Sequence, residues 1–516
     1  FQTNFVYLLL PVAVLFLTRA LACMSGVMES ISCDVPFHRK LIALSRENGW
    51  FNSARDYKPE YPMLYHWLLS RFPQRWDEWW SAIHSTILDA LQIGLLIAVL
   101  IVGGAGLAPL ALYFAGPLLL ALHGAWLRTG HGPRAYVLNP RIFGEAMTAA
   151  CMTALYYYSL TGSVAAYLSA VFLAFVVLNS SRFSAQALFG ICLIVGLLLR
   201  STAVFLTPFA AAIVSLIVFR GVCWNLIKGH VQHIALLAAD DTSWHSNRNS
   251  VRTLREFRSK WGRKGFFLYL YRENSVTAGL IDNLPLLACL CASVAGFGSI
   301  HPPPFVSAWL LAGAVLWLCT SQRRFAYLGE PERYLSHAAV PGYVCVLLWL
   351  NSLPLQVTIA IILLQIVAYI PHHIALLALK RRQPVSDERS QNRQAMESFL
   401  ASLPEAKLLT AGGRELTYGL ANASPHRVWF FDKTLAAQYT DLLDGDSFFP
   451  RWKAVDALGC ELVVVDRDAV QQRYGEARGM PPDFDSNRLS QLFENRYYSV
   501  HQVAHACTVT REPRAS

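Results

Sequence analysis

The sequence predicts an all-α polytopic membrane protein with about eleven transmembrane helices and a small soluble α/β domain at its C-terminus. Hydrophobic residues make up 54% of the 516 positions and charged residues only 15%, whereas a soluble globular protein carries about 25% charged residues. Apolar runs of the length that a span needs, roughly 20 residues, recur as far as Leu379. After Lys380 the chain becomes polar, and short β-like runs alternate with helical stretches, which predicts the soluble domain.

The apolar runs define the expected spans. The run 184–219 is too long for one span and is interrupted by Arg200-Ser-Thr and by Pro208, so we expect two spans there. The first run, Phe5 to Cys23, exceeds the hydrophobic region of a signal peptide and lacks a clear cleavage site, so we expect an uncleaved span. The full set of expected spans is 5–23, 85–104, 107–126, 143–161, 163–179, 184–200, 202–219, 283–300, 304–320, 337–352 and 354–379.

The long polar stretch 24–84, between the first two spans, predicts two helices that lie in the membrane interface. Segments 35–48 and 61–71 repeat apolar residues at helical spacing, and three tryptophans follow. Amphipathic helices rich in Trp, Arg and Lys lie in the interface between lipid and water. The residues expected on their apolar faces are Phe37, Leu41, Ile42 and Leu44 in the first helix, and Leu64, Trp67 and Leu68 in the second.

Two further regions lie outside the expected spans. The connection 221–282 is rich in Arg and Lys, which is typical of a surface that contacts lipid headgroups. The region 383–516 is the expected soluble domain, whereas 1–382 forms the membrane domain. Within the soluble domain, β-like runs occur at 407–410, 427–431 and 461–466 and a helical stretch at 388–402, without a Gly-rich phosphate loop.

The formal net charge of +10 predicts basic loops beside anionic headgroups or bound phosphates. Nucleic acid is not an expected partner, because no basic-aromatic module stands out in a soluble segment. The eleven cysteines are scattered, and no CxxC pair with metal-binding spacing occurs. A disulfide between Cys23 and Cys33 remains an open alternative.

Asp34, in the stretch SCDVPFHRK directly after the first span, is the first candidate for chemistry. One interpretation is a helix N-cap, because Pro36 follows in the first turn, where a missing N–H costs nothing. The other is a general base at the interface, because a partly desolvated carboxylate can accept a hydroxyl proton. His38, one helical turn later, would position a substrate, ligate a metal beside Asp34, or simply lie in the interface.

Three other clusters carry candidate binding residues. In KPEYPMLYHW, Lys58, Tyr61 and His66 are candidates for contact with a phosphate or substrate, although Tyr, Trp and Lys also serve as plain interface anchors. In NPRIFGE, Arg141 and Glu145 are four residues apart and would also form a simple pair. An ionisable residue such as Glu145 at the edge of a span is costly, which favours a functional role; Asp89, inside the second span, is a weaker candidate.

The last cluster is YLGEPERYLSHAAVP, between two expected spans. Arg333 is suited to a phosphate, because its planar guanidinium makes bidentate contacts. A solvated turn is the alternative interpretation. The charged and aromatic candidates in this loop are Glu330, Glu332, Arg333 and Tyr334, with His337 following.

Taken together, these segments resemble the GT-C superfamily of polytopic glycosyltransferases, and most closely the bacterial family-39-like enzymes, which include protein mannosyltransferases and lipid A aminoarabinose transferases. The resemblance covers roughly 1–379. It rests on the acid after the first span, Tyr-Pro-x-Leu-Tyr-His-Trp at 61–67, PRxFGE at 140–145 and GEPERYL at 329–335. One departure is that many members carry two adjacent acids after the first span, whereas Val35 follows Asp34 here and Glu29 lies five residues earlier.

The resemblance implies a sugar donor carried on a polyprenyl phosphate and a single inverting displacement onto an acceptor hydroxyl. Asp34 would be the general base, and Arg333, with Arg141 or Lys58 as alternatives, would stabilise the leaving phosphate. Tyr61, His66, Glu145, Glu330, Glu332 and Tyr334 would contact the substrates. No cofactor is required by this scheme, although some relatives use a divalent metal, for which His38 is the candidate ligand here.

The topology follows from the span count. With the N-terminus inside, 24–84, 127–142, 321–336 and the C-terminal domain lie outside, so Asp34, Arg141 and Arg333 share one membrane face. The positive-inside rule would instead keep 221–282 and Lys380-Arg-Arg inside, but that rule weakens for loops of about 60 residues. We therefore expect a bacterial plasma (inner) membrane protein whose site faces the periplasm. A transporter or flippase of lipid-linked sugars is the alternative, although no internal repeat supports it.

Overall fold

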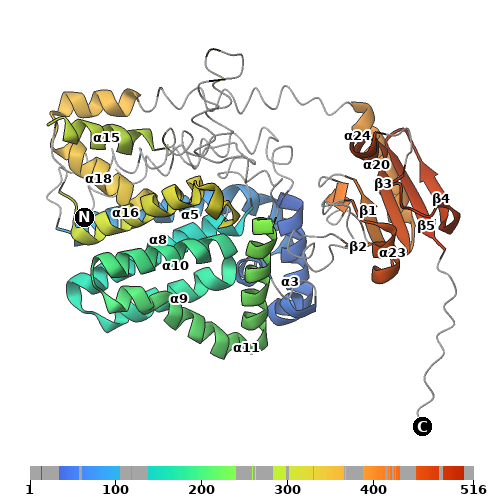
Figure 1. Ribbon diagram of the computed structural model, residues 1–516, viewed down its shortest axis with the longest axis horizontal. Coiled ribbons are helices and arrows are strands. Elements are labelled where there is room, and N and C mark those ends of the chain that lie inside the picture. The colour runs from blue at the N-terminus through green and yellow to red at the C-terminus, as the bar shows by residue number, and fades with distance from the viewer. Residues whose placement is uncertain are drawn as a thin grey trace, which may run out of the picture. The chain divides into compact units, whose positions relative to one another are not determined.

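The computed structural model of the chain (Figure 1) describes residues 13, 34–56, 61–104, 118, 138–239, 259, 262, 280, 283–297, 301–328, 331–364, 367, 387–412, 416–417, 419–420, 424, 426–429, 449–475 and 480–504. The chain divides into two compact units, Phe1–Leu379 and Lys380–Ser516. The described part of the chain is mostly helical, with a small sheet in the second unit.

The described part of the first unit consists of helices. Short 3-10 turns occur at Gln74–Trp76 (η1) and Arg323–Leu328 (η6). The labelled helices are α3 (Asp34–Asp56), α4 (Leu64–Ser70), α5 (Asp77–Val102), α8 (Pro140–Thr161), α9 (Val164–Ser180), α10 (Arg182–Leu198), α11 (Thr202–Ala239), α15 (Leu284–Val294), α16 (Pro304–Thr320), α17 (Glu332–Ser336) and α18 (Ala339–Asn351), and a further helix covers Leu355–Leu364.

Two segments of the described chain are long and apolar enough to cross a membrane, His84–Val102 in α5 and Thr202–Phe219 in α11. Five shorter apolar helices accompany them: Val164–Ser180, Arg182–Leu198, Pro304–Thr320, Ala339–Asn351 and Leu355–Leu364. The total of eleven spans stays a prediction, because nearly all of 5–23 and 107–126 lies outside the described residues.

The break expected within 184–219 lies at Leu199–Ser201, between α10 and α11, where Arg200 adopts a φ of +52°. The expectation that Pro208 also interrupts the helix is wrong, because Pro208 lies inside α11. A proline removes one backbone hydrogen bond without ending a helix that is held by its neighbours. The helix also continues to Ala239, so the first part of the expected connection 221–282 is helical.

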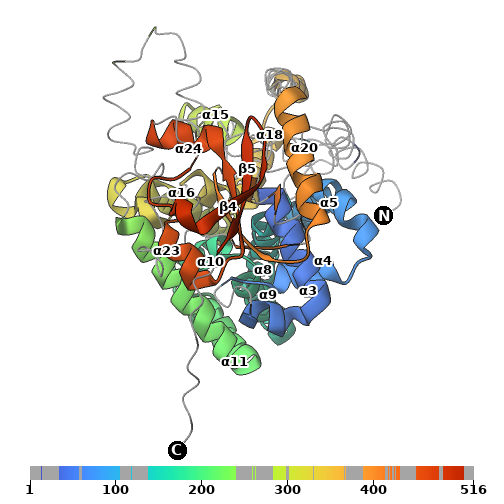
Figure 2. The ribbon, with the colours of Figure 1, turned by 90° about the vertical axis from the view of Figure 1, so that its right-hand side faces the viewer.

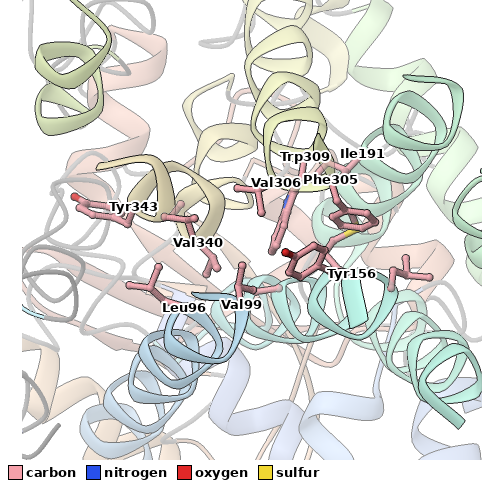
Figure 3. Close-up of a cluster of buried hydrophobic side chains, with 14 of the residues drawn as sticks. Leu96, Val99, Tyr156, Ile191, Phe305, Val306, Trp309, Val340 and Tyr343 are labelled. Atoms are coloured by element: carbon pink, nitrogen blue, oxygen red, sulfur yellow. The ribbon is translucent and has the colours of Figure 1, made fainter. Parts of the chain in front are cut away.

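The core of the first unit lies between α5, α8, α10, α16 and α18 (Figure 3). Leu96 and Val99 of α5, Tyr156 of α8, Trp309 of α16 and Val340 of α18 belong to the same buried cluster. Trp309 satisfies its ring N–H by donating to the His337 carbonyl at 3.1 Å. Close packing and such hydrogen bonds hold the helices of the bundle together.

Helices α3 and α4 pack against each other and against the bundle, and their buried faces differ from the expected ones. α3 buries His38, Leu41, Ile42 and Ser45, whereas Leu44 is only half-buried. α4 buries Leu64, Tyr65, His66 and Leu69, whereas Trp67 and Leu68, expected on its apolar face, are half-buried. The reason is a small cluster, Ile42, Tyr65, Leu69 and Leu138, in which the two helices meet the chain before α8.

The second unit contains a five-stranded sheet, in the order β2-β1-β3-β5-β4. β1 (Lys407–Ala411), β2 (Arg427–Trp429) and β3 (Leu462–Asp466) run parallel, whereas β4 (Leu489–Glu494) and β5 (Tyr498–Val503) pair antiparallel at one edge. Figure 2 shows α20 (Asp387–Ser402) on one side of the sheet and α23 (Trp452–Leu458) and α24 (Arg467–Tyr474) on the other.

Asp466, at the end of β3, connects the layers of this unit. Its carboxylate accepts from the Ala469 backbone N–H and so caps α24. The same carboxylate pairs with Arg389 of α20 at 2.7 Å. Because β3 is buried along its whole length, these bonds satisfy the one charged group that the strand carries inward.

Candidate functional site

Two histidines from the first and second motifs form a buried pair. His38 of α3 and His66 of α4 place Nδ1 and Nε2 2.9 Å apart, and their rings stack at 5.2 Å. One nitrogen of such a pair must carry the proton that the other accepts. Since α3 and α4 pack together, two segments 28 residues apart are joined through this bond.

Aromatic side chains surround the histidine pair. Tyr61 lies 5.7 Å from the His66 ring, and Tyr65 meets the same ring edge-on at 5.1 Å. Tyr65 also lies 6.1 Å from His84, near the start of the span in α5. Burial raises the pKa of Tyr65 well above its ordinary value, so its hydroxyl stays protonated.

The start of α10 reaches this cluster. Ser181 is the N-cap of α10, because its side chain accepts from the Ser184 backbone N–H. Arg182, the first helical residue, lies with its guanidinium 5.5 Å from the centre of the Tyr61 ring. A cation over an aromatic face is attracted by the quadrupole of the ring. The first turn of α10 therefore contacts the second motif.

The next residue of α10, Phe183, contacts the late loop. Its ring lies 4.8 Å from Tyr334 and 5.9 Å from His337, and the Arg333 guanidinium lies 5.8 Å from its centre. The Tyr334 hydroxyl donates to the Leu328 carbonyl at 3.0 Å. Burial raises the pKa of Tyr334, although the neighbouring Arg333 opposes this effect.

The third motif lies at the same end of the bundle. Asn139 caps α8 by accepting from the Arg141 backbone N–H at 2.9 Å, and Pro140 follows in the first turn. A Cβ on Gly144 would lie 2.5 Å from the Cβ of Ser184, so α8 and α10 cross in close contact. Glu145, the residue after Gly144, is almost completely buried.

Helix α5 adds further polar groups beside this crossing. Leu88 packs with Ile142 and Ala146 of α8. The next residue, Asp89, is buried and accepts a long hydrogen bond from Gln92 at 3.5 Å. Buried carboxylates therefore occur on both α5 and α8, within helices that pack against each other.

Around the start of α10 the structure thus brings together four of the predicted site residues: Tyr61, Arg141, Arg333 and Tyr334. His66 lies beside Tyr61 and is bonded to His38, and Glu145 follows Gly144 at the crossing of α8 and α10. Asp34 opens α3, as expected for a residue at a helix start, one turn before His38, but its side chain lies outside the described part. Glu332 opens α17, and its side chain is likewise outside it. Lys58 and Glu330 lie outside the described residues altogether.

Arg182, Phe183, Tyr65 and His84 were not among the residues that the sequence predicted for the site. For Arg182 and Phe183, the predicted topology already indicated a position beside the other motifs. The link 180–183, between the expected spans 163–179 and 184–200, falls on the same membrane face as the loops that hold the other motifs. A charged residue and an aromatic residue in that short link, Arg182 and Phe183, were therefore candidates.

The described residues contain no group of three or more His, Cys, Asp and Glu side chains placed to hold a metal. His38 directs Nδ1 at Nε2 of His66. A metal held by Asp34 and His38 stays a prediction, because the Asp34 side chain lies outside the described part.

The site combines two arginines, Arg182 and Arg333, with neutral donors and buried acids at one end of a helical bundle. Arginines at that end suit a phosphate, and histidine and tyrosine suit hydroxyl groups. No protein-family model matches the chain, and comparison with curated proteins gives no match either.

Proposed function

We propose that the protein is an inverting glycosyltransferase of the GT-C type, which moves a sugar from a polyprenyl-phosphate donor to an acceptor hydroxyl. The acceptor is a glycan, lipid or protein of the cell envelope. One observation supports the proposal: three short motifs contact the first turn of α10, through Tyr61, the Arg141 carbonyl and Tyr334, and the first motif joins the second through the contact between His38 and His66. An unrelated set of interface anchors has no reason to converge in this way.

The reaction needs a base, an acceptor and a stabilised leaving group. In the proposed step, Asp34 removes the proton of the acceptor hydroxyl, and the oxygen attacks the anomeric carbon from the face opposite the phosphate. The bond from that carbon to the phosphate oxygen breaks, and the lipid phosphate leaves with the bonding electron pair. The proton remains on Asp34 until it exchanges with water.

The leaving phosphate requires positive charge rather than an acid. Arg333 is the proposed main ligand, since its guanidinium lies beside Phe183 at the site. Arg182, whose guanidinium lies over Tyr61, would add positive charge from the first turn of α10, and Arg141 or Lys58 are the alternatives to Arg333. Tyr61, His66, Tyr334 and the acids Glu145, Glu330 and Glu332 are the proposed contacts to the sugar and the acceptor.

The proposed location is the plasma (inner) membrane of a bacterium, with the site and the C-terminal domain facing the periplasm. Two membrane-length apolar helices support the membrane assignment. A lipid-linked donor supports the same location, because its isoprenoid tail has to remain in lipid.

The test is sugar transfer by the purified full chain in lipid nanodiscs, supplied with synthetic polyprenyl-phosphate sugars and envelope acceptors. We expect wild type to release polyprenyl phosphate and to form a glycosylated product. Asp34→Asn should lower the rate by about 10²–10⁴-fold, the range for loss of general base catalysis. Arg333→Gln should cost about 10²–10³-fold, as for loss of one donor that stabilises developing charge.

Arg324→Gln is the matched control, because Arg324 is an exposed arginine of η6, only nine positions before Arg333. It should transfer sugar at the wild-type rate. Transfer by Asp34→Asn at the wild-type rate would remove Asp34 from the mechanism. Movement of the lipid-linked sugar across a liposome bilayer without any glycosylated product would instead indicate a transporter.

A further inference from the structure

Tyr65 holds a buried hydroxyl that the proposed mechanism does not use. The residue lies in α4 and is only 2% exposed. Its ring is enclosed by His66, His84 and Phe143, at centre-to-centre distances of 5.1, 6.1 and 5.6 Å. Among the residues that the structure describes, none forms a hydrogen bond with the Tyr65 hydroxyl.

A tyrosine hydroxyl in such a place is costly. Buried tyrosines usually find a hydrogen-bond partner, and a buried polar group without one destabilises the fold. Tyr334, the other buried tyrosine of the site, follows this rule by donating to the Leu328 carbonyl. Phenylalanine at position 65 would keep every ring contact and avoid the cost, so packing does not explain the hydroxyl.

The position of Tyr65 points to a neutral ligand group. The arginine beside the histidine cluster lies over Tyr61, and Arg333 lies beside Phe183, whereas the rings around Tyr65 are two histidines and a phenylalanine. A phosphate would bind at the arginines. A sugar presents hydroxyl groups and apolar ring faces, which match one phenol donor among aromatic and imidazole rings.

We propose that the Tyr65 hydroxyl donates a hydrogen bond to one hydroxyl of the donor sugar, which makes Tyr65 a specificity-determining residue. This inference rests on the proposed glycosyltransferase function. Because its high pKa keeps the phenol protonated, it remains a donor over the whole physiological pH range. A site built to bond a substrate hydroxyl rejects the analogue that lacks it, since the buried protein group then remains unsatisfied.

The test pairs a variant with a set of donors. Wild type and Tyr65→Phe, as full chains in nanodiscs, are supplied with one accepted polyprenyl-phosphate sugar and with its monodeoxy analogues. Wild type should lose about tenfold or more in kcat/KM with one analogue. Tyr65→Phe should lose a similar factor with the parent sugar and show no further loss with that analogue, as expected when both changes remove the same bond.

Tyr156→Phe is the control, because Tyr156 is a buried tyrosine near the other end of α8, beside Phe305. It should discriminate between the donors as wild type does. The thermal midpoint of Tyr65→Phe should equal or exceed that of wild type, since the variant removes an unsatisfied group.

Three results would overturn the inference. Wild-type rates and wild-type discrimination in Tyr65→Phe would show that the hydroxyl contacts no sugar. An equal loss on every donor together with a lower thermal midpoint would assign Tyr65 a structural role. In both cases the proposed transfer reaction would stand, whereas the absence of transfer by wild type from any donor would overturn the proposed function itself.

Discussion

His501 is a single side chain that makes the stability of the C-terminal unit depend on pH. It lies on β5, is 6% exposed, and its Nε2 lies 2.8 Å from the Ser499 hydroxyl. Burial lowers its pKa below the ordinary 6.5, although nearby Glu494 acts in the opposite direction. The folded unit therefore resists protonation of a group that the unfolded chain protonates readily.

The expected consequence is a loss of stability in weak acid. Because the folded pKa is lowered, the stabilising effect of neutral His501 is complete above about pH 6.5 and is lost as pH falls below it towards the folded value. Thermal unfolding of the full chain between pH 5 and 8 tests this.

His501→Gln should flatten the pH dependence of the C-terminal unfolding transition. His301→Gln, at an exposed position of the other unit, should leave that dependence unchanged. Equal slopes in wild type and His501→Gln would contradict the prediction.

The residues of the site were only partly predictable from the sequence. His38, Tyr61 and His66 could be found because each lies near a helix start with charged or aromatic neighbours. Tyr65 could not, because an apolar pattern does not distinguish a ring in the core from one whose hydroxyl lacks a partner. Arg182 and Phe183 acquire their importance from contacts with residues more than a hundred positions away, and no local pattern encodes such contacts.

The site depends on the crossing of helices α8 and α10. It holds the first turn of α10 against the NPRIFGE segment, with Gly144 at the point of closest approach. A Cβ there would meet the Cβ of Ser184 at 2.5 Å and that of Ser181 at 3.0 Å, so the helices would have to separate.

We therefore expect Gly144→Ala to be destabilising even though alanine favours helices. Forcing an extra methyl group into a packed contact costs about 1–3 kcal/mol. The displaced α10 should also carry Arg182 and Phe183 away from their partners, so transfer activity should fall more than stability alone explains. Gly94→Ala is the matched control, since a Cβ at Gly94 of α5 meets nothing within 4 Å; it should stabilise by about 0.5–1 kcal/mol. A Gly144→Ala protein as stable and active as Gly94→Ala would refute this role of the crossing.

Elements with strong apolar patterns were predicted well, and elements with weak patterns were not. β1, β2 and β3 occur where the sequence indicated. Buried parallel strands have nearly continuous apolar sequences, which makes them easy to recognise. β4 and β5 were missed: β4 is largely exposed, and β5 buries Ser499 and His501 among its apolar residues. α15 and α18 are shorter than the expected spans 283–300 and 337–352, because apolar turns at helix ends have the same composition as the helices.

For the first unit as a whole, the outer surface is apolar in places where a soluble protein would be polar. Val164, Leu168 and Phe172 of α9 are each at least 60% exposed, and Ile217 of α11 is 70% exposed. Large exposed apolar patches mark contact with lipid or protein. Since α11 includes one of the two membrane-length segments, lipid is the natural neighbour for this surface.

The same bundle predicts which positions share a membrane face. α8 and α10 both begin at the site, so Thr161 and Arg200, which follow their far ends, lie away from it. Arg71 ends α4, which carries His66, and Arg324 lies in η6, whose Leu328 accepts from Tyr334, so these two lie at the site end. Single cysteines at these four exposed positions should divide by end when intact cells are treated with a membrane-impermeant maleimide, with labelling of the unsubstituted chain subtracted. Under the proposed topology, Arg71→Cys and Arg324→Cys label from outside, and Thr161→Cys and Arg200→Cys only after lysis.

The reverse labelling pattern would place the site in the cytoplasm and exclude a periplasmic reaction. Labelling of all four from one side would show that the bundle does not cross the membrane, because its two ends must then contact the same solution.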